Sequence, residues 1–316
     1  MTRDKKHIAR IKFQNKLLSS DKQTFEDLFT KVMQLYDKNF RSVKPHGKEG
    51  DKKCDGFNKV TGQYYQAYAP EDLSGKEKIA QIKLNDTING IFAFWQSISP
   101  VKEFYFVIND QYNGVWPKIS LQLAEIAQKH KIIADTLLCK DLEDIFLQLQ
   151  EDDIIEILGG LLPSAANITN IDISSLGEVI DHLLRSERKP KEERFPNDPN
   201  FDKKIRFNNL SEEYAIFLKV AYQQTYMIDD YFIYNSSFIK QDLKLAFSDF
   251  YTKAQNSILE SFENRSDVIF QKIWDDASPR NTSPFRNAAL VLMSHYFESC
   301  DIFEEPIEPI QSSLFE

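Results

Sequence analysis

Two oxygen-bearing side chains, Asp55 and Gln66, stand at predicted ends of neighbouring strands. Asp55 comes just before Gly56 in a glycine-punctuated stretch, and the aromatic-rich run that holds Gln66 ends at Tyr68. Turn signals on both sides of an aromatic run predict a hairpin from Asp55 to Tyr68. If the two strands pair in register, Asp55 lies opposite Gln66. Two such oxygens, the carbonyl of Ala67 and waters make a ligand set for a hard divalent cation such as Mg²⁺.

Side chains alternate along a strand, so Tyr64, Gln66 and Tyr68 share one face of the predicted hairpin. This face would carry the polar tips beside the carboxylate. A second interpretation of the same residues involves no chemistry. Asp51 and Asp55 are then turn residues, and the tyrosines are ordinary strand formers. The residues alone leave both interpretations open.

A further carboxylate, Glu26, lies near the start of a helix predicted over residues 22–36. Its place just beside the apolar stripe would let it orient a bound metal. A first-turn Glu also complements the positive end of the helix dipole, which is the simpler explanation. The preceding helix, predicted over residues 4–18, is basic and amphipathic. Its charges could contact phosphate or form a solvated face.

The elements that would position these residues form one α/β domain, predicted over residues 1–160. Segments with apolar residues at helical spacing alternate with short apolar runs that are typical of buried strands. Their order is helix, helix, three strands, helix, strand, helix, strand and helix. The predicted ranges are 4–18, 22–36, 40–44, the hairpin 55–68, 75–95, 103–108, 117–129, 132–138 and 141–149.

The second half of the chain is predicted to be mostly α-helical. Residues 161–210 form a connecting segment, which includes a charged, proline-containing linker over 186–200. Residues 211–316 form a helical domain with many tyrosines and phenylalanines, which could be a core, a dimer face or both. The predicted helices of this half are 173–184, 212–224, 226–234, 237–263, 268–276 and 286–299.

Composition limits the classes of function. The chain has 316 residues, enough for two domains, and its net charge of −9 argues against a basic nucleic-acid-binding surface over the whole protein. The three cysteines, Cys54, Cys139 and Cys300, are widely spaced and lack zinc-site neighbours. We therefore expect no disulfide framework, no structural zinc and a reducing compartment. Since no apolar run has the length of a signal peptide or a membrane span, we expect a cytoplasmic protein with no membrane partner.

The order of Glu26, Asp55 and Gln66-x-Tyr68 resembles the PD-(D/E)XK nuclease superfamily, in particular its Mrr-like branch. The resemblance implies a restriction-endonuclease-like mixed sheet flanked by helices. It also implies that Asp55, Gln66, the Ala67 carbonyl and Glu26 are metal ligands, with Asp51 as a reserve. Tyr68 stands where the family carries a catalytic Lys, whose charge stabilises the phosphate in the transition state.

Three lysines near the motif, Lys44, Lys53 and Lys59, could supply the missing ammonium group. The sequence does not choose among them. The resemblance thus implies a catalytic set of Asp55, Gln66, Glu26 and Tyr68 with one position changed.

A narrower resemblance rests on the run from Gly50 to Glu71 and on the downstream run from Lys204 to Ser211. Both runs are similar to effector proteins of ABC-three-component, or Lamassu-type, anti-phage systems. This resemblance implies a variable N-terminal effector domain and a shared helical C-terminal domain that docks and self-associates. It also implies three kinds of partner: an SMC-like ATPase, a small third subunit and double-stranded DNA.

Together the two resemblances predict a DNA endonuclease that depends on Mg²⁺ or Mn²⁺ and is active when released or oligomerised. The alternative is a degenerate nuclease-fold subunit that binds DNA or the ATPase without cutting. The Tyr68 substitution favours this alternative, and the pairing of Asp55 with Gln66 favours the enzyme.

Overall fold

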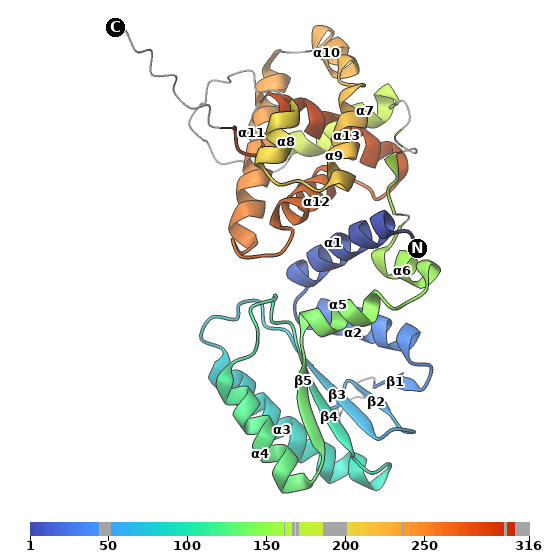
Figure 1. The fold of residues 1–316 in the computed structure, drawn as a ribbon, viewed down its shortest axis with the longest axis vertical. Helices are drawn as coiled ribbons and strands as arrows, with labels where there is room; N and C mark the ends of the chain where they lie inside the picture. The colour runs from blue at the N-terminus through green and yellow to red at the C-terminus, as the bar shows by residue number, and fades with distance from the viewer. Residues whose placement is uncertain are drawn as a thin grey trace, which may run out of the picture. The chain divides into compact units, whose positions relative to one another are not determined.

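The computed structural model divides into two compact units, Met1–Gly159 and Gly160–Glu316, and each is described by itself (Figure 1). The structure describes residues 1–43, 52–160, 162–165, 168, 171–185, 201–235, 237–299 and 302–306. Four features expected from the sequence lie outside the described residues: Lys44, Asp51, Cys300 and the linker 186–200. Within the described residues, no helix has both the length and the apolar character that a membrane span requires.

The first unit is built on a five-stranded mixed sheet with the order β1-β2-β3-β4-β5. Strand β2 is antiparallel to both of its neighbours, β1 and β3, and β3, β4 and β5 run parallel. The strands are β1 (Phe40–Ser42), β2 (Gly56–Asn58), β3 (Gln63–Tyr68), β4 (Glu103–Ile108) and β5 (Ile133–Leu137). The predicted hairpin is confirmed by the pairing of Gly56 with Tyr65, a register that brings Asp55 to the level of Gln66.

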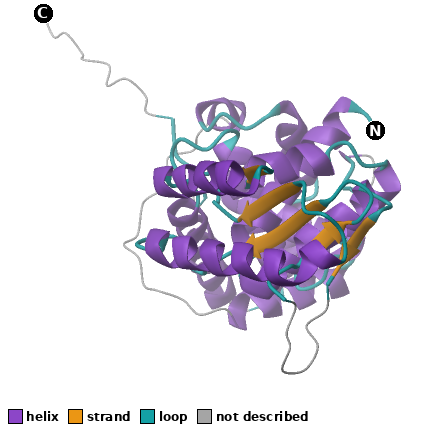
Figure 2. Cartoon of the chain, turned by 90° about the horizontal axis from the view of Figure 1, so that it is seen from below, coloured by secondary structure: helices purple, strands orange, loops and turns teal. Residues whose placement is uncertain are grey.

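Helices cover both faces of this sheet (Figures 1 and 2). One face packs against α2, whose Phe29 contacts the ring of Tyr65. The other face packs against α3 and α4 and forms a core with Tyr64 and Phe104. The helices are α1 (Arg3–Ser19), α2 (Lys22–Tyr36), α3 (Glu77–Phe94), the 3₁₀ helix η2 (Trp95–Ser97), α4 (Pro117–His130), α5 (Cys139–Phe146) and α6 (Glu151–Leu158).

Helix α1 is more deeply packed than a solvated basic helix. Phe13 is fully buried and stacks on Phe146 of α5, with 4.0 Å between the ring centroids. Arg10 lies 3.2 Å from the buried carboxylate of Glu143, and Lys5 pairs with Glu151 of α6. Carboxylates of the same unit thus pair with two of the cations of α1.

The second unit is a bundle of helices. The segment 161–210, expected to connect two domains, contributes α7 and α8 to this bundle, and α7 packs against α11, α12 and α13. The helices are α7 (Ile173–Arg185), α8 (Phe201–Phe207), α9 (Glu212–Tyr222), α10 (Tyr226–Ile233), α11 (Ser237–Ser257), α12 (Arg265–Ala277) and α13 (Ser283–Glu298).

The run from Lys204 to Ser211, which carried part of the resemblance, has structural contacts in this bundle. The Lys204 ammonium is fully buried and donates to the carbonyl of Phe297 in the last turn of α13, at 2.7 Å. A cation at this position bonds a carbonyl of the last helical turn and interacts favourably with the negative end of the helix dipole. Asn208 donates to the carbonyl of Glu304 and accepts from its N–H, so it fixes the segment after α13.

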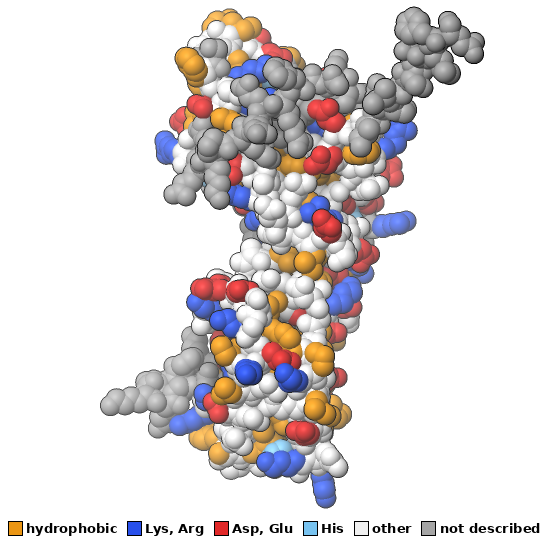
Figure 3. Space-filling view, turned by 90° about the vertical axis from the view of Figure 1, so that its left-hand side faces the viewer, with side chains coloured by type: hydrophobic (Ala, Val, Ile, Leu, Met, Phe, Trp, Pro, Cys, Tyr) orange, Lys and Arg blue, Asp and Glu red, His pale blue; other side chains and the backbone are white. Residues whose placement is uncertain are grey.

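Exposed hydrophobic side chains gather at the end of the second unit that carries α10, at the top of Figure 3. Ile233, Tyr234 and Phe238 are 73%, 86% and 78% exposed. Such large apolar side chains usually mark a contact surface when several lie together.

The close packing of Gly56 against Phe40 gives a prediction for stability. A Cβ atom at Gly56 would lie 2.2 Å from Cζ of Phe40, a ring that Phe29 and Tyr65 hold in place. We therefore expect Gly56→Ala to lower the free energy of unfolding of the first unit by about 1–3 kcal/mol, measured by calorimetry.

Gly177→Ala is the matched control, because no atom lies within 4 Å of its Cβ position in α7. This change should be neutral or stabilising by up to about 1 kcal/mol. Unfolding of Gly56→Ala at the wild-type temperature would show that the Phe40 ring moves aside without cost.

Candidate functional site

The candidate site lies where β3 extends beyond the first residue of β2. Ladder pairing between the two strands ends at Gly56 and Tyr65, so no described strand pairs with Ala67 on that side. Backbone groups at a sheet edge need other partners when they are buried. Asp55 Oδ2 accepts the N–H of Ala67 at 2.6 Å, and Lys83 Nζ donates to its carbonyl at 2.9 Å. A carboxylate and an ammonium group thus provide the hydrogen-bond partners that a neighbouring strand would otherwise give to Ala67.

Asp55 and Gln66, which the sequence pairs across the hairpin, do meet. Gln66 Nε2 donates to Asp55 Oδ2 at 2.5 Å, and both residues are buried, at 4% and 3% exposure. The Asp55 N–H also donates to the carbonyl of Tyr65 at 3.0 Å, which fixes the carboxylate at the strand end. The other amide atom, Gln66 Oε1, is buried with no hydrogen-bond partner in the structure as described.

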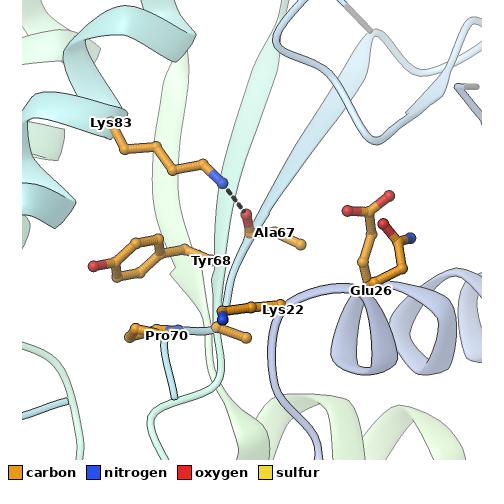
Figure 4. Close-up of a pocket in the computed structure, with 8 residues that line it drawn as sticks. Lys22, Glu26, Ala67, Tyr68, Pro70 and Lys83 are labelled. Atoms are coloured by element: carbon orange, nitrogen blue, oxygen red, sulfur yellow. Dashed lines mark hydrogen bonds between the residues drawn. The ribbon is translucent and has the colours of Figure 1, made fainter. Parts of the chain in front are cut away.

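Lys83 is the residue of this site that the sequence analysis missed. It projects from α3 and ends at the carbonyl of Ala67, the backbone group that was expected to bind a metal (Figure 4). The helical pattern contained a signal for it. Lys83 lies three residues after Ala80 and four before Thr87, and both of these are fully buried. A Lys at that spacing faces the sheet, where its charge needs a partner.

The lysines proposed from the sequence lie elsewhere. Lys59 belongs to the turn between β2 and β3, at the opposite end of β3 from Ala67. The side chain of Lys53 packs over Gly90 on α3. Lys44 is outside the described residues, so Lys83 is the lysine whose contact with the site the structure describes.

Tyr68, at the position of the expected Lys, is a core residue. Its ring stacks on Phe106 with 5.6 Å between centroids, and its hydroxyl is buried without a hydrogen-bond partner among the described residues. Burial raises the pKa of Tyr68 above its ordinary value, so the phenol stays protonated and neutral at physiological pH. The Lys83 ammonium lies 5.6 Å from the centre of the Tyr68 ring. The positive charge beside Tyr68 and the Ala67 carbonyl therefore comes from Lys83 of α3.

A hollow of about 320 Å³ opens in front of the Ala67 carbonyl (Figure 4). Glu26 enters it from α2 and Lys83 from α3, with Ala67 between them. Asp55 and Gln66 do not line it. The full lining is Lys22, Gln23, Glu26, Ala67, Tyr68, Ala69, Pro70 and Lys83.

Two cations and one carboxylate line this hollow, so it suits an anionic ligand better than a cationic one. Lys22 forms an exposed ion pair with Glu71, and this hydrogen bond raises the pKa of Lys22 and lowers that of Glu71. The backbone N–H of Lys22 also donates to the carbonyl of Ala69 at 2.7 Å. This bond attaches the start of α2, and with it Glu26, to the end of β3.

The structure brings together part of the ligand set that the sequence predicts for a divalent cation, because Asp55 and Gln66 meet, whereas Glu26 lines a hollow that neither of them lines. Mg²⁺ is commonly held by one or two carboxylates together with waters, and Asp55 is the carboxylate that lies beside Gln66. The unpartnered Gln66 Oε1 is a buried acceptor that a cation or its water would satisfy. To hold a cation beside Asp55, the amide must turn Oε1 toward it, and this terminal torsion is soft. Among the described residues, no three His, Cys, Asp or Glu side chains form a metal cluster.

Comparison with known proteins gives one match, in the second unit. Residues 174–304 match the family model of C-terminal domain 10 of the ABC-three component (ABC-3C) systems. The match covers less than half of the chain and none of the first unit, and it supports membership in such a system. No curated protein and no solved structure matches the chain.

The contacts of Asp55 predict that it stabilises the fold whatever its chemistry. Asp55→Ala leaves the buried Ala67 N–H and the Gln66 amide without their acceptor, and we expect a loss of about 3 kcal/mol in the free energy of unfolding. Asp55→Asn keeps an oxygen for Ala67, and Gln66 can present Oε1 to the new amide. Its loss should be smaller, as measured by denaturant unfolding. Equal losses for both variants would contradict this account of the edge.

Proposed function

We propose that this protein is the effector subunit of an ABC-three component anti-phage system and that its first unit is a metal-dependent DNA endonuclease. The observation that carries the proposal is the meeting of Asp55 with Gln66 beside the Ala67 carbonyl, which Lys83 contacts. A carboxylate and an amide at adjoining strand ends, with an ammonium group from α3 beside them, can hold a metal ion and stabilise the charge that develops in phosphodiester hydrolysis.

The order of elements supports the same proposal. Helix α2 precedes the antiparallel strands β1, β2 and β3, and α3 then leads to the parallel strand β4. This order is the one expected from the resemblance to PD-(D/E)XK nucleases. It places Asp55 and Gln66 on neighbouring strands, and it presents Glu26 and Lys83 from the two covering helices.

Each residue has a distinct role in the proposed reaction. A bound Mg²⁺ or Mn²⁺ would polarise the scissile phosphate and lower the pKa of a bound water. Asp55, Gln66 and the Ala67 carbonyl would hold that ion, and Glu26 would orient the water. The Lys83 ammonium has three N–H donors, and the remaining ones can stabilise negative charge on the phosphate. Tyr68 packs and positions Lys83, and it carries no charge.

Membership in a multi-component system supports the proposed partners. These are an SMC-like ATPase and a small third subunit, with double-stranded DNA as the substrate. Because one nuclease unit of this kind cuts one strand, cleavage of both strands would need at least two copies. The helical unit, whose residues 174–304 match the ABC-3C domain, would hold the effector in the complex.

A second candidate is a nuclease-fold subunit that binds DNA or the ATPase and does not cut. Its support is the burial of Asp55 and Gln66 and the use of Asp55 Oδ2 by two N–H donors. A carboxylate committed in this way needs no metal to remain stable. The endonuclease proposal predicts that DNA cleavage depends on Lys83, whereas the second candidate predicts no cleavage.

Lys83→Ala tests the enzyme directly. With Mg²⁺ or Mn²⁺ and supercoiled plasmid, the variant should nick at a rate about 100-fold below the wild type, because charge on the phosphate is no longer stabilised. Lys78→Ala removes an exposed Lys from the α4-facing side of the same helix and should leave the rate unchanged. Absence of nicking by the wild type in its complete complex would favour the binding subunit. Nicking by Lys83→Ala at the wild-type rate would show that Lys83 has no part in the reaction.

Metal binding can be measured without activity. We expect Mn²⁺ at about 100 times its Kd to stabilise the wild type by about 2–3 kcal/mol, seen as a rise in the Tm of the first unit. Asp55→Asn should lose this rise, and Lys78→Ala should keep it. A rise that survives in Asp55→Asn would place the ion elsewhere.

A further inference from the structure

Helix α10 and the start of α11 expose an unusual amount of apolar surface. The tip cluster, defined as Tyr226, Ile233, Tyr234 and Phe238, consists of side chains that are between 58% and 86% exposed. On α10 itself, Ile228 is fully buried and anchors the helix to the bundle. The exposed apolar side chains of α10, Tyr226 and Ile233, are thus not needed to pack this short helix against the bundle.

Helical spacing places two members of the cluster on one side of α10, together with two carboxylates. Tyr226 and Ile233 are seven residues apart and therefore share a face. Asp229 and Asp230 lie between them and are exposed. The same face of α10 therefore presents both apolar side chains and the carboxylates of Asp229 and Asp230.

The surroundings of the cluster are acidic as well. Residues 222–242 contain three aspartates and one lysine. That lysine, Lys240, lies over the ring of Phe232 at 5.9 Å from its centre. Asp181 of α7 is also close: burial raises the pKa of Tyr231 on α10, and the Asp181 carboxylate raises it further. The charged side chains on α10 and close to it are therefore mostly acidic.

We infer that the tip cluster is the docking surface for another subunit of the ABC-three component system, which presents an apolar pocket rimmed by Lys and Arg. The inference rests on the system membership stated under the proposed function and is independent of catalysis. Large, rigid apolar side chains provide most of the binding energy of interfaces, and complementary charge steers the encounter.

A second copy of this chain is the less suitable occupant. In a symmetric dimer the same patch would face itself, so Asp229 and Asp230 of each copy would meet the same carboxylates of the other. Like charges across an interface oppose association. The chain as a whole also carries a net charge of −9, which adds to this repulsion.

The experiment is co-expression of the full chain with the two other components of its own system, followed by measurement of Kd for each purified component. The variant Ile233→Ser/Tyr234→Ser should bind one of them at least about tenfold more weakly. Its Tm should equal that of the wild type, because both side chains are exposed. Ile173→Ser on α7, where the side chain is 70% exposed, is the matched control and should bind normally.

A charge variant tests the chemistry of the partner. Asp229→Lys/Asp230→Lys should also weaken binding at least about tenfold, and the wild-type Kd should rise with salt. Wild-type affinity in either double variant would overturn the inference, as would a wild type that binds neither component. Loss of self-association in light scattering, with component binding intact, would assign the surface to a dimer instead. Because the readout is binding, a failed nuclease assay leaves this test unaffected.

Discussion

The first unit depends on how the edge of β3 is completed beyond β2. The buried N–H and C=O of Ala67 would each cost free energy if they had no partner. Asp55 accepts from one and Lys83 donates to the other, so two residues far apart in the sequence fix the hairpin, α3 and the strand end together. The carboxylate of Asp55 and the ammonium group of Lys83 therefore have a structural role, which is to pair the buried backbone groups of Ala67.

This double role affects how mutations at the site are interpreted. Removal of Asp55 takes away an acceptor of the fold and a possible metal ligand at once. A variant that keeps the oxygen separates the two effects, whereas truncation to Ala does not. Lys83 has a double role of the same kind, because it donates to the Ala67 carbonyl and also lines the open hollow.

The sequence predicted local features better than distant contacts. Periodicity located α2 and β4, and turn signals with strand alternation predicted the Asp55–Gln66 register, because these depend on residues close in the chain. It did not predict that Lys83 would reach Ala67, since that contact depends on how α3 packs across the sheet. It also treated residues 161–210 as a connection, although α7 and α8 pack within the helical unit.

The completed edge of β3 has a further consequence for how the protein behaves at high concentration. An open strand edge can recruit a strand from another molecule, which leads to aggregation or to unintended partners. At Ala67 the carboxylate of Asp55 and the ammonium of Lys83 occupy the backbone groups that an incoming strand would use. The same pair of charges therefore protects the sheet against intermolecular strand addition.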